Sequence, residues 1–173
     1  MNPLTEEKQG LGGWLILIAI NLFIIPLEFS MTLIQDFLPI FQGGSWEALT
    51  TPGSEKYHHL WAPLLIFEMT GYILFLIFSI VLLFLFFMKA YKFPMLFIIF
   101  LALNLIYSVT DFFISDLIPT IAAESPPDDV LKFFASLTGV IIWIPYFLVS
   151  KRVKNTFVKP ESPMLHPSTQ MTP

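Results

Sequence analysis

The stretch FLIFSIVLLFLFF, residues 75–87, holds no charged residue, and its single polar side chain is Ser79. It forms the most apolar part of a longer hydrophobic segment that covers residues 61–87. About 20 mostly apolar residues of helix cross a hydrocarbon core of roughly 30 Å. A lone segment of that length satisfies its backbone hydrogen bonds in lipid only as a helix. We therefore predict a transmembrane helix at 61–87.

Three further apolar segments are long enough to span a membrane, at about residues 13–34, 94–118 and 130–149. The predicted fold class is all-α: a polytopic membrane protein built as an up-and-down bundle of four transmembrane helices. The bundle forms a single domain over residues 1–158. Outer loops are expected at 39–59 and 119–129. The segment 159–173, rich in Pro, Ser and Thr, is expected to be a disordered cytoplasmic tail.

The composition excludes several classes of protein. Hydrophobic residues make up 55% of the 173 residues and charged residues only 13%, whereas a soluble domain carries about 25% charged residues. A soluble globular domain and a disordered chain are therefore both excluded. The net charge of −4 argues against nucleic-acid binding, which uses basic surfaces. With no cysteine and no nucleotide or phosphate motif, the sequence predicts no metal site and no cofactor.

Lysine and arginine are unevenly distributed between the two sides of the predicted bundle. Four spans place seven of them on the side of the termini: Lys8, Lys89, Lys92, Lys151, Arg152, Lys154 and Lys159. The other side carries only Lys56 and Lys132. Because cytoplasmic segments are enriched in Lys and Arg, we predict that both termini are cytoplasmic.

Two motifs near the ends of the hydrophobic region resemble those of a known family. GLGGWLIL, residues 10–17, opens the first span, and PYFLVSKRVKNTFV, residues 145–158, closes the last. Together they resemble the bacterial inner-membrane proteins catalogued as domain of unknown function 2569. The resemblance implies a multi-pass protein of the bacterial cytoplasmic (inner) membrane with four spans. It supplies no established activity and no catalytic residues.

The basic part of the second motif falls at the predicted cytoplasmic interface. Lys151, Arg152 and Lys154 are candidates for contact with lipid head groups or with a partner, because anionic head groups attract cations. The alternative is that these residues only fix the topology. In the first motif, Gly12 and Gly13 allow a neighbouring backbone to approach closely.

Three carboxylates fall well inside the predicted spans: Glu28, Glu68 and Asp111; Asp116 lies further out, near the outer end of the third span. At 1.5 Å per residue, all three lie in the outer half of the bilayer. We expect no Lys or Arg to accompany them there. Ionisable residues are costly in lipid, so within spans they are candidates for function by default.

The helical period gathers polar residues on one face of several spans. The predicted faces are Asn21, Glu28, Thr32 and Gln35 on the first span, Asn104, Ser108, Asp111 and Ser115 on the third, and Ser136, Gly139, Trp143, Tyr146 and Ser150 on the fourth. Lipid penalises polar residues, so these faces are expected to turn inward. We therefore predict an acidic pocket in the outer half of the bundle, with these candidate ligand- or ion-binding residues: Glu28, Glu68, Asp111, Asn21 and Asn104.

The carboxylates have three interpretations that the sequence leaves open. They are structural groups, either protonated and bonded between helices or simply hydrated; they bind a cation, a proton or a ligand; or they face a partner helix. A shared site requires at least two of the carboxylates to lie within about 6 Å of each other, where neighbouring charges shift a pKa. If the carboxylates point to different faces, the bundle is an interaction scaffold.

The predicted function is that of a non-enzymatic membrane protein, an accessory or binding component with an acidic outer pocket. Its partners are the lipid bilayer and either another membrane protein or further copies of itself. A small proton- or cation-coupled carrier is the alternative. An intramembrane aspartic hydrolase is disfavoured, because it needs two aspartates that share a proton across helices, and the fourth predicted span contains no Asp.

Overall fold

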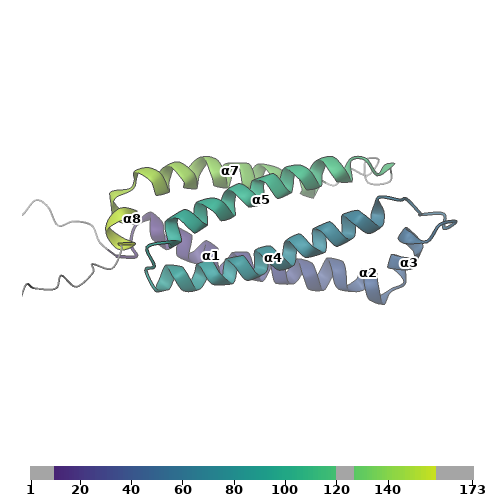
Figure 1. The fold of residues 1–173 in the computed structure, drawn as a ribbon, viewed down its shortest axis with the longest axis horizontal. Coiled ribbons are helices and arrows are strands. Elements are labelled where there is room, and N and C mark those ends of the chain that lie inside the picture. The colour runs from purple at the N-terminus through teal and green to yellow at the C-terminus, as the bar shows by residue number, and fades with distance from the viewer. Residues whose placement is uncertain (1–9, 120–126, 159–173) are drawn as a thin grey trace, which may run out of the picture.

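A computed structural model describes residues 10–119 and 127–158, with side chains of the last long helix from residue 131 onward. This part of the chain is helical and contains no strand. Its long helices are α1 (Trp14–Thr32), α4 (Trp61–Phe87), α5 (Phe93–Ser115) and α7 (Pro127–Val149). With the continuation of α1, they give four helices long and apolar enough to cross a membrane. The predicted all-α, four-span fold class is confirmed (Figure 1).

The first span is longer than the predicted helix at 13–34. α1 passes through a π-helical turn, η1 (Leu33–Phe37), into α2 (Leu38–Gln42), and together they form one apolar stretch of 29 residues. Pro39 stands at the beginning of α2, directly after the π turn. Its missing N–H therefore falls where the helical hydrogen-bond pattern already changes, so the helix continues through it.

Residues 39–59, predicted as an outer loop, are only partly irregular. They contain most of α2 and a further short helix, α3 (Ser45–Thr50). Between the two helices, the Gly43 N–H donates to the Pro39 carbonyl at 2.8 Å, and Gly44 adopts a left-handed φ of 73°. The rings of Phe41 and Trp46 stack at 5.2 Å between centroids, which holds α2 and α3 together.

The remaining boundaries lie within a few residues of the predictions. α5 ends at Ser115 rather than near residue 118. α7 begins at Pro127 rather than near residue 130, since proline is well suited to a first helical turn. Most of the second predicted outer loop, residues 120–126, and the predicted tail at 159–173 lie outside the described residues.

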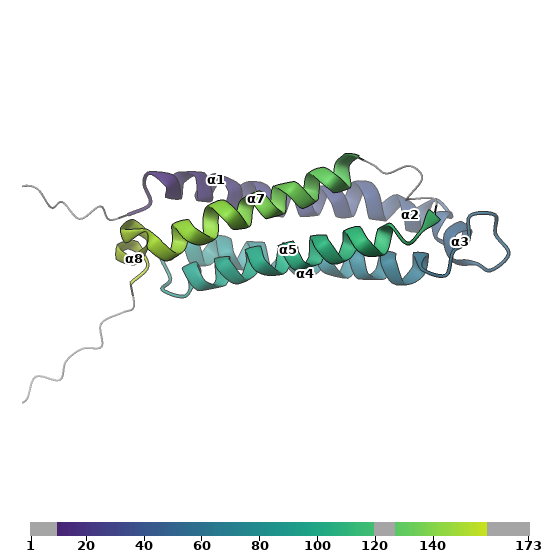
Figure 2. The ribbon, with the colours of Figure 1, turned by 90° about the horizontal axis from the view of Figure 1, so that it is seen from above.

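The long helices run alternately up and down (Figures 1 and 2). α1 packs on α4, α4 on α5 and α5 on α7. The chain before α1, the α4–α5 turn and a short helix, α8 (Lys151–Thr156), lie at one end, here called the termini end. α2 and α3 lie at the opposite end, called the loop end. α1 and α7 do not pack along their length; in Figure 1 they approach at the termini end and separate toward the loop end.

A buried aromatic cluster fills the termini half of the bundle. Phe93 at the beginning of α5 is fully buried, and its ring centroid lies 5.1 Å from that of Phe86 and 4.9 Å from that of Phe157. Phe147 of α7 joins the cluster at 5.9 Å from Phe93. Such tilted and edge-to-face ring pairs each contribute about 0.5–1.5 kcal/mol beyond area burial. The cluster therefore joins α4, α5, α7 and the residue after α8.

A second contact at this end joins Gly10–Gly13 to α8, and we call it the clasp. The Gly10 N–H donates to the Thr156 hydroxyl oxygen at 3.1 Å, and the Thr156 hydroxyl lies 3.3 Å from the Gly10 carbonyl. Ser150 caps α8 by accepting from the Val153 N–H at 3.4 Å. The clasp therefore ties the beginning of the first span to the segment after the last span.

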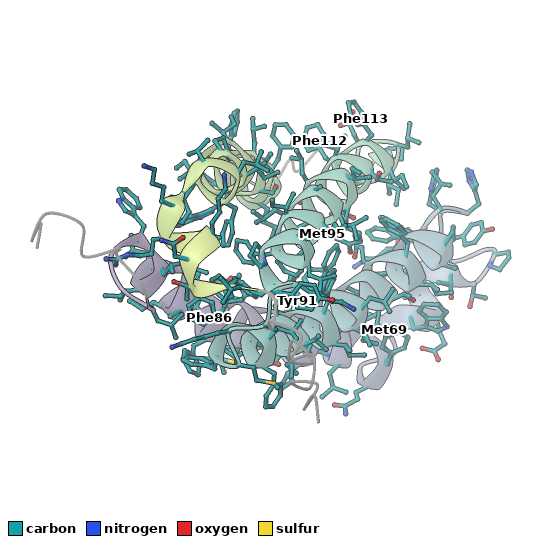
Figure 3. All side chains as sticks on the ribbon, turned by 60° about the vertical axis from the view of Figure 1, so that its left-hand side comes forward. Met69, Phe86, Tyr91, Met95, Phe112 and Phe113 are labelled. Carbon is teal, nitrogen blue, oxygen red and sulfur yellow. The ribbon has the colours of Figure 1, made fainter. Side chains whose placement is uncertain are left out.

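Large apolar side chains cover the outside of the long helices. Leu74 of α4 is 62% exposed and Phe113 of α5 is 65% exposed. Figure 3 shows Phe113 on the outer surface of α5. Soluble monomers rarely expose apolar surface on this scale, whereas lipid chains solvate it. The surface therefore fits a lipid bilayer environment.

Candidate functional site

A groove of about 650 Å³ lies between α1 and α7, where these two helices separate. Its volume is within the range of small-molecule sites, roughly 300–1,000 Å³. Residues of α5, with Tyr72 of α4, form its floor. Polar side chains of three helices line it: Asn21, Glu28, Thr32, Asn104, Ser108, Lys132 and Ser136. The groove is therefore a polar opening on the side of an otherwise apolar bundle.

The α1 wall of the groove carries Asn21, Glu28 and Thr32. Their spacing of seven and four residues puts them on one helical face, as predicted from the sequence. Asn21 donates to the Leu17 carbonyl of its own helix at 3.0 Å. Gln35, predicted on the same face, is outside the groove lining because it falls in η1, where the wider π turn changes the helical phase.

The floor is aromatic and depends on a glycine. Tyr107 stacks on Phe67 at 5.0 Å and meets Tyr72 edge-on at 6.2 Å. A Cβ atom at Gly71 would overlap the Tyr107 ring, so only glycine lets this ring lie against α4. The Tyr107 hydroxyl then donates to the Glu68 backbone carbonyl at 3.1 Å. Gly71 thus sets the position of the Tyr107 ring in the floor of the groove.

The α7 wall includes Lys132, which was expected on the outer side but not beside the carboxylates. Lys132 and Glu28 line the same groove, so the expectation that no cation accompanies the acids is wrong. Lys132 precedes Ser136 by four residues and therefore extends the predicted polar stripe of α7 by one turn. The four-residue spacing between Lys132 and Ser136 could have predicted this position. The prediction missed Lys132 because it began the polar stripe of the fourth span at Ser136.

Asp111 lies beside the groove in a smaller cavity of about 30 Å³. Tyr72, Tyr107, Ser108 and Lys132 line both cavities and form the partition between them. A cavity above about 10–15 Å³ has room for a water molecule, and the polar lining offers it partners. Lys132 lines this cavity together with Asp111 and Tyr72. A lysine and a carboxylate therefore share the space beside the groove.

The predicted site residues are divided among three settings. Asn21, Glu28 and Asn104 line the groove, and Asp111 lines the smaller cavity. Glu68 is half-buried on α4 and lines neither space. Among the described residues, no three His, Asp or Glu side chains gather as a metal-binding group. The groove therefore offers a ligand hydrogen-bonding groups, an aromatic floor and charges of both signs.

The predicted head-group residues at the termini end differ in exposure. Lys151 and Lys154 are exposed on α8, whereas Arg152 is half-buried. The Arg152 guanidinium lies against Gly12 and Gly13: a Cβ atom at these glycines would stand 2.6 and 3.0 Å from its Nη1 atom. Arg152 is thus a component of the clasp, and Lys151 and Lys154 form the basic surface.

The clasp joins the two motifs on which the family resemblance rests. No curated protein and no solved structure matches the chain. The family model described as "protein of unknown function (DUF2569)" matches residues 8–158, which include both motifs and all four spans. The chain therefore belongs to the DUF2569 family.

Proposed function

We propose that the chain is a non-enzymatic binding protein of the bacterial cytoplasmic membrane, with both termini in the cytoplasm. It takes up its ligand or partner from within the membrane, through the groove between α1 and α7. The observation that carries the proposal is this groove: about 650 Å³ of polar and aromatic lining on the side of a membrane bundle. Polar side chains are costly where they face lipid, so a bound molecule that meets them stabilises the protein.

The distribution of basic residues supports the orientation. Lys89 and Lys92 in the α4–α5 turn lie at the same end as Lys151 and Lys154 of α8. At the loop end, Lys56 lies in the connection before α4. Cytoplasmic segments are enriched in Lys and Arg, so the termini end is the cytoplasmic one, and the part of the groove that carries Thr32 and Lys132 faces the outer leaflet.

The accessory role is favoured over a carrier because the termini end of the bundle is closed. The aromatic cluster around Phe93 and the clasp fill this end, whereas the groove lies along the middle of the bundle, from Asn21 to Thr32 on α1. A carrier also needs access from the cytoplasmic side. An aspartic hydrolase is disfavoured because Glu68, the candidate partner of Asp111, does not line the cavity that Asp111 lines.

The orientation is tested by labelling single cysteines, since the chain has none of its own. Glu55→Cys places a thiol at the loop end and Tyr91→Cys one in the α4–α5 turn, and both positions are exposed. In intact spheroplasts, a membrane-impermeant maleimide is expected to label residue 55 at once and residue 91 only after permeabilisation. The reverse order would overturn the proposed orientation.

The groove is tested by photo-crosslinking in cells. A benzophenone amino acid at Ala135 faces the groove, and the same group at Ile141 of α7, which is 62% exposed, is the matched control outside it. We expect one discrete adduct at residue 135 and only bulk lipid adducts at residue 141. Identical adduct patterns would contradict the proposal. Ion or solute flux in proteoliposomes that stops with Glu68→Gln would instead establish the carrier.

A further inference from the structure

The groove is about as long as one lipid leaflet is thick. Its lining runs from Asn21 to Thr32 on α1 and from Leu131 to Trp143 on α7. The two stretches extend about 16 and 18 Å at 1.5 Å per residue, and half of a roughly 30 Å hydrocarbon core is about 15 Å. Because α1 and α7 do not pack on each other along this length, the groove opens sideways, where lipid chains lie.

The lining changes in polarity along this length. Lys132, Glu28 and Thr32 belong to the part nearer the loop end. Phe97, Phe100 and Trp143 belong to the part nearer the termini end, where Asn21 is a polar neighbour whose amide is bonded to its own helix. Between them, the side chains of Asn104, Ser108 and Ser136 offer hydrogen-bonding groups. A molecule that fits this order has a charged head, a polar linker and an apolar chain, which is the order of groups in a phospholipid.

The charges indicate which head group fits. Glu28 lies on the α1 wall and Lys132 on the α7 wall of the same groove. A carboxylate accepts charge-assisted hydrogen bonds from an ammonium group, and a lysine ammonium donates them to a phosphate. A zwitterionic head with a phosphate and a primary amine offers each residue a group of opposite charge. An anionic head without an amine meets Lys132 but is repelled by Glu28.

We propose that the groove binds a zwitterionic phospholipid, with its primary ammonium against Glu28 and its phosphate against Lys132. One acyl chain lies along Phe97, Phe100 and Trp143. This inference rests on the proposed function, because it assigns a ligand class to the same groove. It also explains how Glu28 is accommodated at membrane depth, since the lipid ammonium supplies a counter-charge to its carboxylate.

The head-group assignment is tested with the full chain reconstituted in equimolar phosphatidylethanolamine and phosphatidylglycerol. After extraction in mild detergent, native mass spectrometry measures the lipid that each protein retains. We expect about tenfold preference for phosphatidylethanolamine, the ratio that one charge-assisted hydrogen bond supplies. Glu28→Gln is expected to bring the ratio close to one, and Glu47→Gln in α3, an exposed carboxylate outside the groove, to leave it unchanged.

The phosphate contact is tested in the same mixture. Lys132→Gln removes the cation that both lipids share, so it is expected to lower the retention of both by about the same factor. Lys56→Gln, an exposed lysine at the loop end, is the control and is expected to change neither. Equal retention of both lipids by the unmodified protein, or an unchanged ratio in Glu28→Gln, would overturn the assignment.

A groove-filling variant separates failure of the assignment from failure of the proposed function. Gly139→Phe places a ring in the groove, and Ile141→Phe places one on the lipid-facing side of α7. If Gly139→Phe abolishes lipid retention but the unmodified protein shows no head-group preference, the groove binds lipid and the assignment is wrong. If the two variants retain lipid equally, the groove is not the site. Ala135→Phe repeats the test should Gly139→Phe lower the unfolding temperature.

Discussion

The two ends of this bundle are built from the same four helices but do different things. At the termini end, aromatic rings from α4, α5 and α7 interlock, and the clasp closes over them. At the loop end, α1 and α7 separate, and charged and polar side chains line the space between them. One end is filled and the other is left open. Side-chain choice along each helix, rather than helix number or length, therefore decides where the membrane bundle is closed.

The largest expected effect tests the closed end. Phe93→Ala removes a fully buried ring from the aromatic cluster and is expected to lower the free energy of unfolding by about 3–5 kcal/mol. Phe113→Ala, on the same helix but 65% exposed, is the control. Thermal unfolding in detergent measures both. Equal losses for the two variants would mean that the termini end is not the stable part of the bundle.

The next effect tests how the floor of the groove is held. Gly71→Ala forces the Tyr107 ring to move and is expected to cost about 1–3 kcal/mol. Gly139→Ala is the matched control: its Cβ atom would stand 3.9 Å from the nearest side-chain atom, Leu101 Cδ2, which is an ordinary contact. In that variant, the higher helix propensity of alanine is expected to add up to about 1 kcal/mol. If Gly71→Ala and Gly139→Ala change the unfolding temperature in the same direction, the assigned role of Gly71 is wrong.

A smaller effect tests the clasp. Thr156→Val removes the hydroxyl that joins α8 to Gly10 and is expected to cost about 0.5–1.5 kcal/mol. Thr138→Val, whose hydroxyl donates only to the Phe134 carbonyl of its own helix, serves as the comparison. Hydrogen exchange at the Gly10 amide is expected to rise in Thr156→Val alone. If the amide is equally protected in both variants, the clasp does not depend on this hydroxyl.

The smallest effect concerns the open end. Glu28 is exposed and lines the groove rather than the core. Glu28→Gln keeps the shape of this side chain and removes its charge. We expect its unfolding free energy to stay within about 0.5 kcal/mol of the unmodified protein. Membrane insertion is likewise expected to survive replacement of Glu28, Glu68 and Asp111 together by their amides. A loss of several kcal/mol in Glu28→Gln would make this residue structural and remove the contrast between the two ends.

The sequence predicted the elements well because lipid imposes simple constraints. Four apolar segments became four helices, and the spacing of Asn21, Glu28 and Thr32 predicted one wall of the groove. Polar residues are costly against lipid, so helical phase is a strong guide inside a membrane. The same argument from helical spacing predicted Asn104 of the third span, which lies in the floor of the groove.

The remainder depended on contacts between segments that lie far apart in the sequence. No spacing rule places Arg152 against Gly12, a pair separated by all four spans. The division of Glu28, Glu68 and Asp111 among different settings depends on how α4 and α5 rotate against α1, which periodicity does not fix. The π turn at η1 altered the phase of the first span locally and removed Gln35 from the predicted face.

The clasp also has a consequence for biosynthesis. Residues 151–156 follow all four spans in the sequence, so they leave the ribosome after every span has been made, and domains generally form from the N-terminal side first. The Gly10 contact therefore forms at the final stage of assembly, when the earliest part of the bundle meets a late one. A nascent chain that stalls within the fourth span has α1 packed on α4 but lacks this contact, so residues 10–13 stay unsecured and open to the proteases that remove unfinished membrane proteins.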